Sequence, residues 1–76
     1  MPMLKKLSGR ELIKILCNKF GFSLKRTRGS HSILIKKTGS DKIGCVVPLH
    51  KELKIGTVKG ILEQADIDEN EFVKHL

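Results

Sequence analysis

The side chain with the clearest potential for chemistry is His31, which follows the pair Gly29-Ser30. Glycine at the first central position of a two-residue loop is typical of a type II′ hairpin turn, and such a turn places Arg28 directly across from His31, about 5 Å away between Cβ atoms. A guanidinium there disfavours protonation of the imidazole, as a general base requires, and it can hold a phosphate and stabilise its developing charge. The spacing therefore indicates a site for phosphodiester chemistry.

The histidines also have structural interpretations. Side chains two residues apart in a strand lie on the same face, so His31 shares a face with Ile33 and Ile35. In the structural interpretation His31 merely begins a strand and lies partly buried on the core-facing side of a sheet. His75 falls in the expected last helical turn, where a cation complements the helix dipole, and we interpret it as structural. His50 lies in a basic loop; it is a candidate phosphate contact, although a solvated loop residue is the simpler interpretation.

The two cysteines, Cys17 and Cys45, fall in patterns typical of a helix and a strand. In a reducing compartment they are most simply small buried hydrophobes, so we expect no disulfide. The histidines and cysteines show none of the close ligand pairing that is typical of a zinc site. We therefore expect no metal and no cofactor.

A helix is expected over residues 9–20, in front of the hairpin that carries His31. Ser8 and Glu11 form a capping box at its start, and Gly21 provides the left-handed residue that ends such a helix. Its apolar side chains recur at helical spacing on one stripe: Leu12, Ile13, Leu16, Cys17 and Phe20.

Two strands are expected on either side of the Gly29-Ser30 turn, over residues 22–28 and 31–37. A two-residue turn pairs residues whose numbers sum to 59. On one face this register predicts the pairs Arg28–His31, Arg26–Ile33, Leu24–Ile35 and Phe22–Lys37. A second turn over residues 38–41 leads to a third strand over residues 43–47, which Pro48 closes.

A polar loop over residues 49–56 leads to a second helix, for which Thr57 is a plausible N-cap. Asp68, with Glu71 three residues later, forms a second capping box that opens a short terminal helix. We therefore expect one domain over residues 1–76 of the α+β class. Its order is α-β-β-β-α, with a three-stranded antiparallel sheet, two helices on one face and a short C-terminal helix.

The charge of the chain is strongly uneven. Lys and Arg number 15 against 8 Asp and Glu, but residues 61–76 are acidic and the preceding 60 residues carry fourteen of the fifteen basic side chains. Such a field attracts phosphate polyanions, so nucleic acid is the first partner to consider. No apolar stretch approaches the ~20 residues of a membrane span, and residues 1–7 lack the apolar region of a signal peptide. We expect a cytoplasmic protein with no membrane partner.

The chain contains no Trp and no Tyr, so it offers no platform for stacking bases. RNA would be held mainly through phosphates and shape. The candidate contacts are Lys25, Arg26, Arg28, Gly29, Ser30, Lys36, Lys37, His50, Lys51 and Lys54.

Three segments, residues 28–31, 46–50 and 54–62, together resemble the HicA family of toxin mRNA interferases. The resemblance covers about residues 8–74. It implies a double-stranded-RNA-binding-domain-like fold, ribosome-independent cleavage of mRNA and neutralisation by a HicB-type antitoxin. It also implies that His31 is catalytic and that Gly29 and Ser30 support it. Ser32 stands where a second histidine is frequent in that family.

The reaction expected from these observations is metal-independent cleavage of RNA, with DNA not expected as a partner. His31 would take the proton of the ribose 2′-hydroxyl or deliver one to the leaving oxygen. One alternative is a non-catalytic RNA-binding module of the same fold. Another is a toxin-family member that has lost activity and persists as a scaffold for its partner.

Overall fold

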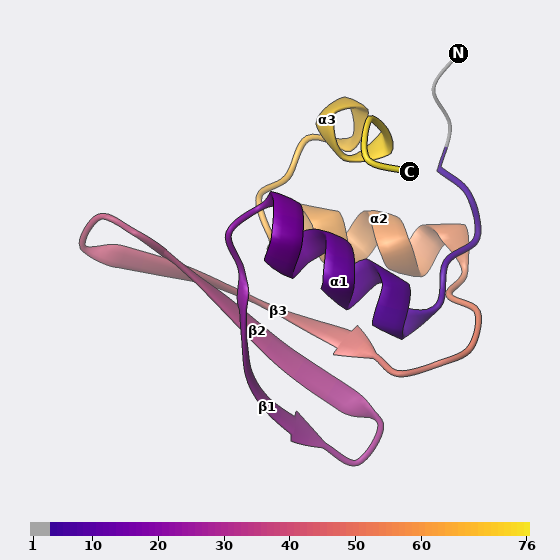
Figure 1. Ribbon diagram of the computed structural model, residues 1–76, viewed down its shortest axis with the longest axis horizontal. Helices are drawn as coiled ribbons and strands as arrows, with labels where there is room; N and C mark the ends of the chain where they lie inside the picture. Colours follow the sequence, from indigo (N-terminus) through magenta and orange to yellow (C-terminus); the bar gives the residue numbers. More distant parts are fainter. Residues whose placement is uncertain (1–3) are drawn as a thin grey trace.

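The computed structural model describes residues 4–76, which form three helices and one sheet (Figure 1). The elements are α1 (Gly9–Lys19), β1 (Ser23–Arg28), β2 (His31–Thr38), β3 (Asp41–Pro48), α2 (Ile55–Gln64) and α3 (Glu69–Val73). The strands pair in the order β1-β2-β3, and both pairings are antiparallel. The predicted α+β architecture is confirmed. Residues 1–3, the start of the segment expected to lack a signal peptide, lie outside the described residues.

The predicted capping box at the start of α1 is present. The Glu11 N–H donates to Ser8 Oγ at 3.0 Å, and the Ser8 N–H donates to Glu11 Oε1 at 2.9 Å. That backbone hydrogen bond from Ser8 lowers the pKa of the Glu11 carboxyl. The helix ends at Lys19, and Gly21 has the left-handed φ of +77° that was expected after it.

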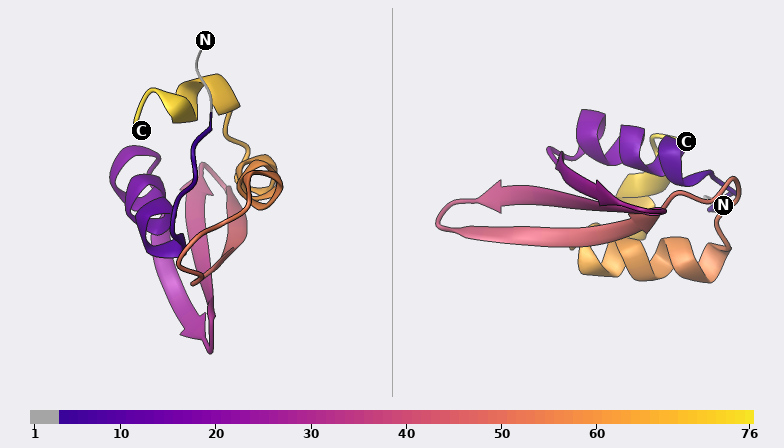
Figure 2. Two further views of the ribbon diagram at one scale, coloured as in Figure 1. Left: turned by 90° about the vertical axis from the view of Figure 1, so that its right-hand side faces the viewer. Right: turned by 90° about the horizontal axis from the view of Figure 1, so that it is seen from below.

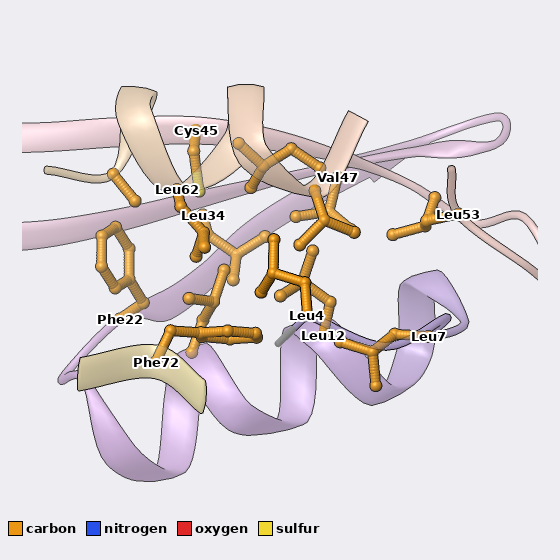
Figure 3. Close-up of a cluster of buried hydrophobic side chains, with 14 residues drawn as sticks. Leu4, Leu7, Leu12, Phe22, Leu34, Cys45, Val47, Leu53, Leu62 and Phe72 are labelled. Atoms are coloured by element: carbon orange, nitrogen blue, oxygen red, sulfur yellow. The ribbon is translucent and has the colours of Figure 1, made fainter. Parts of the chain in front are cut away.

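One face of the sheet is buried under the helices. Ser32 and Leu34 of β2 are buried, and their partners across the ladder, Val47 and Cys45, are buried with them. Figure 3 shows Leu34, Cys45 and Val47 of the strands gathered with core side chains of the three helices: Leu12 of α1, Leu62 of α2 and Phe72 of α3. Since both long helices contribute to this one core, the prediction of two helices on one face is confirmed.

The long β2–β3 hairpin extends beyond the helices (Figures 1 and 2). Its strands are eight residues each, and Thr38 pairs with Asp41 around a two-residue turn in which Gly39 has a φ of +64°. The predicted second turn is therefore confirmed. The strand β1 is shorter, six residues, and every one of them is exposed.

The second helix begins earlier than the sequence indicated, and the prediction of Thr57 as its N-cap is wrong. The N-cap is Lys54, whose carbonyl accepts from the Val58 N–H at 3.0 Å, and its side chain makes no capping bond. The reason is tertiary: buried Leu53 pairs with Leu7 through a backbone bond of 2.6 Å, which fixes the chain just before the first helical turn.

The second predicted capping box is only half formed. Asp68 is the N-cap of α3 and accepts from the Glu71 N–H at 3.2 Å, as expected. The Glu71 carboxylate instead binds Lys74 Nζ at 3.1 Å. The side-chain charge of Lys74 lies within reach of Glu71, so the carboxylate turns away from the helix start.

The start of α1 is pressed against the end of β3. Gly9 is buried, and a Cβ at this position would overlap the backbone carbonyl oxygen of Pro48. The Gly9 N–H donates to the carbonyl of His50 at 2.9 Å. A residue with any side chain here would force the helix and the strand apart.

The contact predicts that Gly9→Ala destabilises the fold by about 1–3 kcal/mol or more, because the new methyl group must displace backbone rather than a flexible side chain. The matched control is Gly60→Ala in α2, where a Cβ would meet nothing within 4 Å. That substitution should stabilise the fold by about 0.5–1 kcal/mol. Urea unfolding midpoints of the two variants measure the difference, and equal midpoints would contradict the close packing of α1 on β3.

Candidate functional site

His31 is the first residue of β2 and is exposed to solvent. It follows a turn in which Gly29 has a φ of +57°, while Ser30 keeps an ordinary negative φ, as a type II′ turn requires. In the sheet His31 pairs with Arg28 on one side and with Pro48 on the other. The predicted pairing of Arg28 with His31 is confirmed.

Backbone hydrogen bonds hold the His31 turn in place from outside the hairpin. The Leu49 N–H donates to the carbonyl of Ser30 at 2.6 Å, and the next residue along, His50, accepts from Gly9. Backbone hydrogen bonds thus connect the turn to the loop after β3, and that loop to the first residue of α1. We call this arrangement the junction; it consists of residues 7–9, 29–31 and 48–53.

His31 lies on the face of the sheet opposite the helices. Its neighbour Ser32 is buried and points toward the core, where its hydroxyl lies 3.2 Å from Thr27 Oγ1. Because side chains alternate along a strand, His31, Ile33 and Ile35 share the other face. We call it the open face. The alternative that His31 is partly buried on the core-facing side is therefore wrong.

The register of the first hairpin departs from the expected one halfway along β1. Arg26 pairs with Ile33 as predicted, but the ladder then shifts, so that Leu24 pairs with Leu34 rather than with Ile35. The predicted Phe22–Lys37 pair is also absent, because Phe22 precedes the strand and its N–H donates to Leu16 of α1 at 3.1 Å. Phe22 is buried in the core, which draws it out of the sheet.

The shift is a bulge that inserts Lys25 as an extra residue. Without it, Lys25 would lie across from Leu34 on the face that the helices cover, where an ammonium group is costly to bury. With the bulge, Lys25 joins Ile35 in lining a hollow on the open face, and Leu24 turns toward Ile13 on the helix side. The bulge therefore keeps the charge in solvent.

Several predicted RNA contacts gather on the open face. Arg28 and Arg26 flank His31 and Ile33, and Lys37 follows further along β2. Sequence reasoning missed Lys42, which pairs with Lys37 across the second hairpin. The signal was present, since the Gly39-Ser40 turn pairs residues whose numbers sum to 79.

The remaining predicted contacts lie elsewhere. Lys36 is on the helix side of β2, and its ammonium sits 6.0 Å from the centre of the Phe22 ring, so the structure does not group it with His31. His50, Lys51 and Lys54 are exposed on the loop between β3 and α2, which begins at the junction. His75 follows α3 rather than ending it, and its ring meets the Phe20 ring edge-on at 5.2 Å.

The cations of the sheet have no ion-pair partners among residues 4–76. The ion pairs in this part of the chain join Lys6 to Glu52, Lys59 to Glu69 and Lys74 to Glu71, all on the exposed surface. None involves a strand residue. The positive field of the open face is therefore not neutralised by the protein itself, which favours an anionic ligand.

The cysteines do not contribute a nucleophile to this face. Cys45 is buried between the sheet and the helices, and burial raises the pKa of its thiol to about 11, with a smaller contribution from Cys17. Both cysteines are free. In the described part of the chain, no three His, Cys, Asp or Glu side chains lie together in a group that could hold a metal ion. No helix there is long and apolar enough to cross a membrane.

Comparison with known protein families identifies a match that covers most of the chain. A family model described as HicA toxin of bacterial toxin-antitoxin matches residues 9–67, which include the junction from Gly9 onward, the whole sheet and α2. Comparisons with curated proteins and with solved structures give no significant match.

The raised pKa of Cys45 predicts slow thiol alkylation in the folded protein. At pH 8 roughly one Cys45 thiol in a thousand would be ionised, and the thiolate is the reactive form. Labelling with iodoacetamide should therefore be slow at pH 8, should accelerate about tenfold per pH unit toward pH 10, and should become fast at pH 8 in urea. Mass spectrometry of the labelled peptides separates Cys45 from Cys17. Labelling of folded Cys45 at the rate seen in urea would contradict its burial.

Proposed function

The chain belongs to the HicA toxin family of bacterial toxin-antitoxin systems, and we propose that it is an endoribonuclease that cleaves mRNA in the cytoplasm with His31 as its catalytic residue. The position of His31 carries the proposal. It is an exposed imidazole in register with an arginine, at one end of a cationic face that lacks counterions among residues 4–76. Its partner in the cell would be a HicB-type antitoxin.

RNA binding would begin with charge. Arg26 and Arg28 lie next to each other on the open face, beside Ile33 and His31, so a phosphate attracted to either guanidinium is brought to the imidazole. Displacing counterions from the RNA makes such binding strongly dependent on salt. The rings of Phe20, Phe22 and Phe72 pack in the protein rather than offering a stacking surface. Base preference should accordingly be modest.

The cleavage step uses one bond exchange at phosphorus. His31 removes the proton of the ribose 2′-hydroxyl, the 2′-oxygen attacks the adjacent phosphorus, and the bond from phosphorus to the 5′-oxygen breaks. The leaving 5′-oxygen takes a proton from solvent water, and the products are a 2′,3′-cyclic phosphate and a 5′-hydroxyl. The Arg28 guanidinium would stabilise the charge that develops on the phosphate oxygens. A single acid-base group contributes about 10²- to 10⁴-fold, so the enzyme should be a modest nuclease.

The junction explains how so small a protein could hold this geometry. Ser30, immediately before His31, is fixed by the Leu49 N–H just after the end of β3, and His31 itself pairs with Arg28 of β1 on the other side. The backbone that carries the imidazole is thus bonded along both of its edges, although the side chain itself is exposed. A catalytic group needs a rigid support of this kind to contribute fully to rate.

A non-catalytic RNA-binding module is the second candidate. It is favoured by one observation: the open face carries a single imidazole, and its other polar groups include the cations Lys25, Arg26, Arg28, Lys37 and Lys42. Ser32, where the family often has a second histidine, is buried and bonded to Thr27. Incubation of the purified protein with RNA in the presence of a chelator separates the two functions. A nuclease shortens the RNA, whereas a binder only shifts its migration.

His31→Ala should reduce RNA cleavage by about 10²- to 10⁴-fold, because it removes the proposed proton-transfer group. Since His31 is exposed, the urea midpoint and the affinity for RNA should remain close to those of the wild type. The matched control is His75→Ala, which removes an imidazole near α3 and should leave cleavage unchanged. Cleavage of a labelled RNA, measured for all three proteins, decides the matter; full activity in folded His31→Ala would refute the assignment.

Arg28→Gln should lower the rate of RNA cleavage roughly 10- to 100-fold, which corresponds to losing a hydrogen bond to a charged group. Arg28→Lys should lower the rate less, because lysine keeps the charge although it cannot form the bidentate hydrogen bonds of a guanidinium. The control is Lys19→Gln, which removes an equal charge from the exposed end of α1. Single-turnover cleavage measures the effect. A rate that is the same in Arg28→Gln and Lys19→Gln would show that Arg28 supplies only general charge.

A further inference from the structure

The far end of the open face contains a second cationic feature, well away from His31. Lys25, Lys37 and Lys42 line a hollow of about 620 Å³, together with Ile35, Ser23 and Gly21. We call it the lysine hollow. It brings together three segments: the bulge of β1, the second half of β2 and the start of β3.

Three lysines around one hollow concentrate positive charge there, which attracts anions. None of the three forms an ion pair within residues 4–76. The nearest acid in the sequence, Asp41, precedes Lys42 directly and borders a neighbouring hollow with Lys37 and Lys42, but it forms no ion pair with either lysine. The positive charge around the hollow is therefore left free to attract an anionic ligand.

The bulge is what completes the hollow. A regular ladder would pair Lys25 with Leu34 on the helix side, and Leu24 would take the place of Lys25 on the open face. A bulge costs regular hydrogen bonding, and such features often re-aim a side chain next to a functional site. Here the side chain that it re-aims is the third lysine of the hollow.

The open face connects the hollow to His31. Lys37 lies six positions after His31 in β2, which corresponds to about 20 Å along the strand. Between the two ends lie Ile33 and Val46, whose pairing puts partly exposed apolar surface beside Arg26. A surface with cations at both ends and apolar groups between them fits one nucleic-acid strand better than an acidic polypeptide, because riboses and bases can cover the apolar part.

We propose that the lysine hollow binds a backbone phosphate of the same RNA strand whose scissile bond lies at His31, so that the open face is the path of the substrate. The proposal rests on the proposed function for its ligand, RNA. It assigns Lys25, Lys37 and Lys42 to binding and not to the chemical step. It also places the substrate on the face of the sheet that the helices leave uncovered.

The test uses the His31→Ala protein, which leaves RNA intact, and compares single-stranded RNAs of 4 and 12 nucleotides by fluorescence anisotropy at several salt concentrations. The longer RNA can reach from His31 to the lysine hollow. Lys37→Gln and Lys42→Gln should each weaken binding of the 12-nucleotide RNA several-fold and reduce the slope of log affinity against log salt by about 0.7. The 4-nucleotide RNA should lose much less.

Lys36→Gln is the matched control, since it removes the same charge from the same strand but from the helix side. It should weaken binding less than twofold. An equal effect of Lys36→Gln, or an equal loss for both RNA lengths, would overturn the proposal. So would variants that lose binding to polyglutamate while keeping their affinity for RNA, because the hollow would then be a surface for an acidic protein.

Cleavage by the wild-type protein keeps this proposal separate from the proposed function. If the wild type does not cleave RNA but binding depends on the hollow, the nuclease assignment fails and the hollow stands. If the wild type cleaves RNA and Lys37→Gln leaves KM unchanged, the hollow fails and the nuclease stands. A raised KM with unchanged kcat in Lys37→Gln supports both.

Discussion

The geometry of this protein depends on the contact between Gly9 and Pro48. The contact has no room for a side chain, and the hydrogen bonds on either side of it run from Gly9 to His50 and from Leu49 to Ser30. One close approach of two backbones therefore fixes the start of α1, the end of β3 and the turn before His31. In a chain of 76 residues the hydrophobic core is small, so backbone bonds at the edge of the sheet are an effective way to hold an exposed residue.

The second organising feature is the division of the sheet into two faces. The helix side is apolar and packed, with Leu34 and Cys45 at its centre, and the open face carries His31 and cations that form no ion pair with residues 4–76. The two faces impose opposite demands on residues 22–25, where Phe22 must stay in the core and Lys25 in water. The bulge at Lys25 satisfies both demands, because the pairing of β1 with β2 shifts by one residue there: Arg26 pairs with Ile33 and Leu24 pairs with Leu34.

Much of the fold could be predicted from the sequence, and the parts that could not have a common cause. The capping box at Ser8 and both glycine turns are local features, so their residue types were sufficient to identify them. The bulge and the start of α2 depend on which residues the core captures, Phe22 in one case and Leu53 in the other. Neighbouring residues along the chain do not contain that information.

The same distinction applies to the site. The pairing of Arg28 with His31 followed from the turn alone, and the structure confirms it. The grouping of Lys42 with Lys37 was also encoded in a turn but was overlooked, whereas the separation of Lys36 from its neighbours needed the faces of the sheet to be known. A fold shows where a side chain lies but not which reaction it catalyses. The catalytic role of His31 therefore stays a prediction, which its exposed position beside Arg28 supports.

If an exposed histidine beside an arginine cleaves RNA through the ribose 2′-hydroxyl, the ends of the RNA fragments carry the chemical signature of that step. The measurement is mass spectrometry of a defined RNA after incubation with the purified protein, alongside the same RNA with a single 2′-deoxy nucleotide at the cleavage position. We expect fragments that end in 2′,3′-cyclic phosphate, and no cleavage at the deoxy position. Equal cleavage of both RNAs, or an intact RNA in both cases, would contradict it.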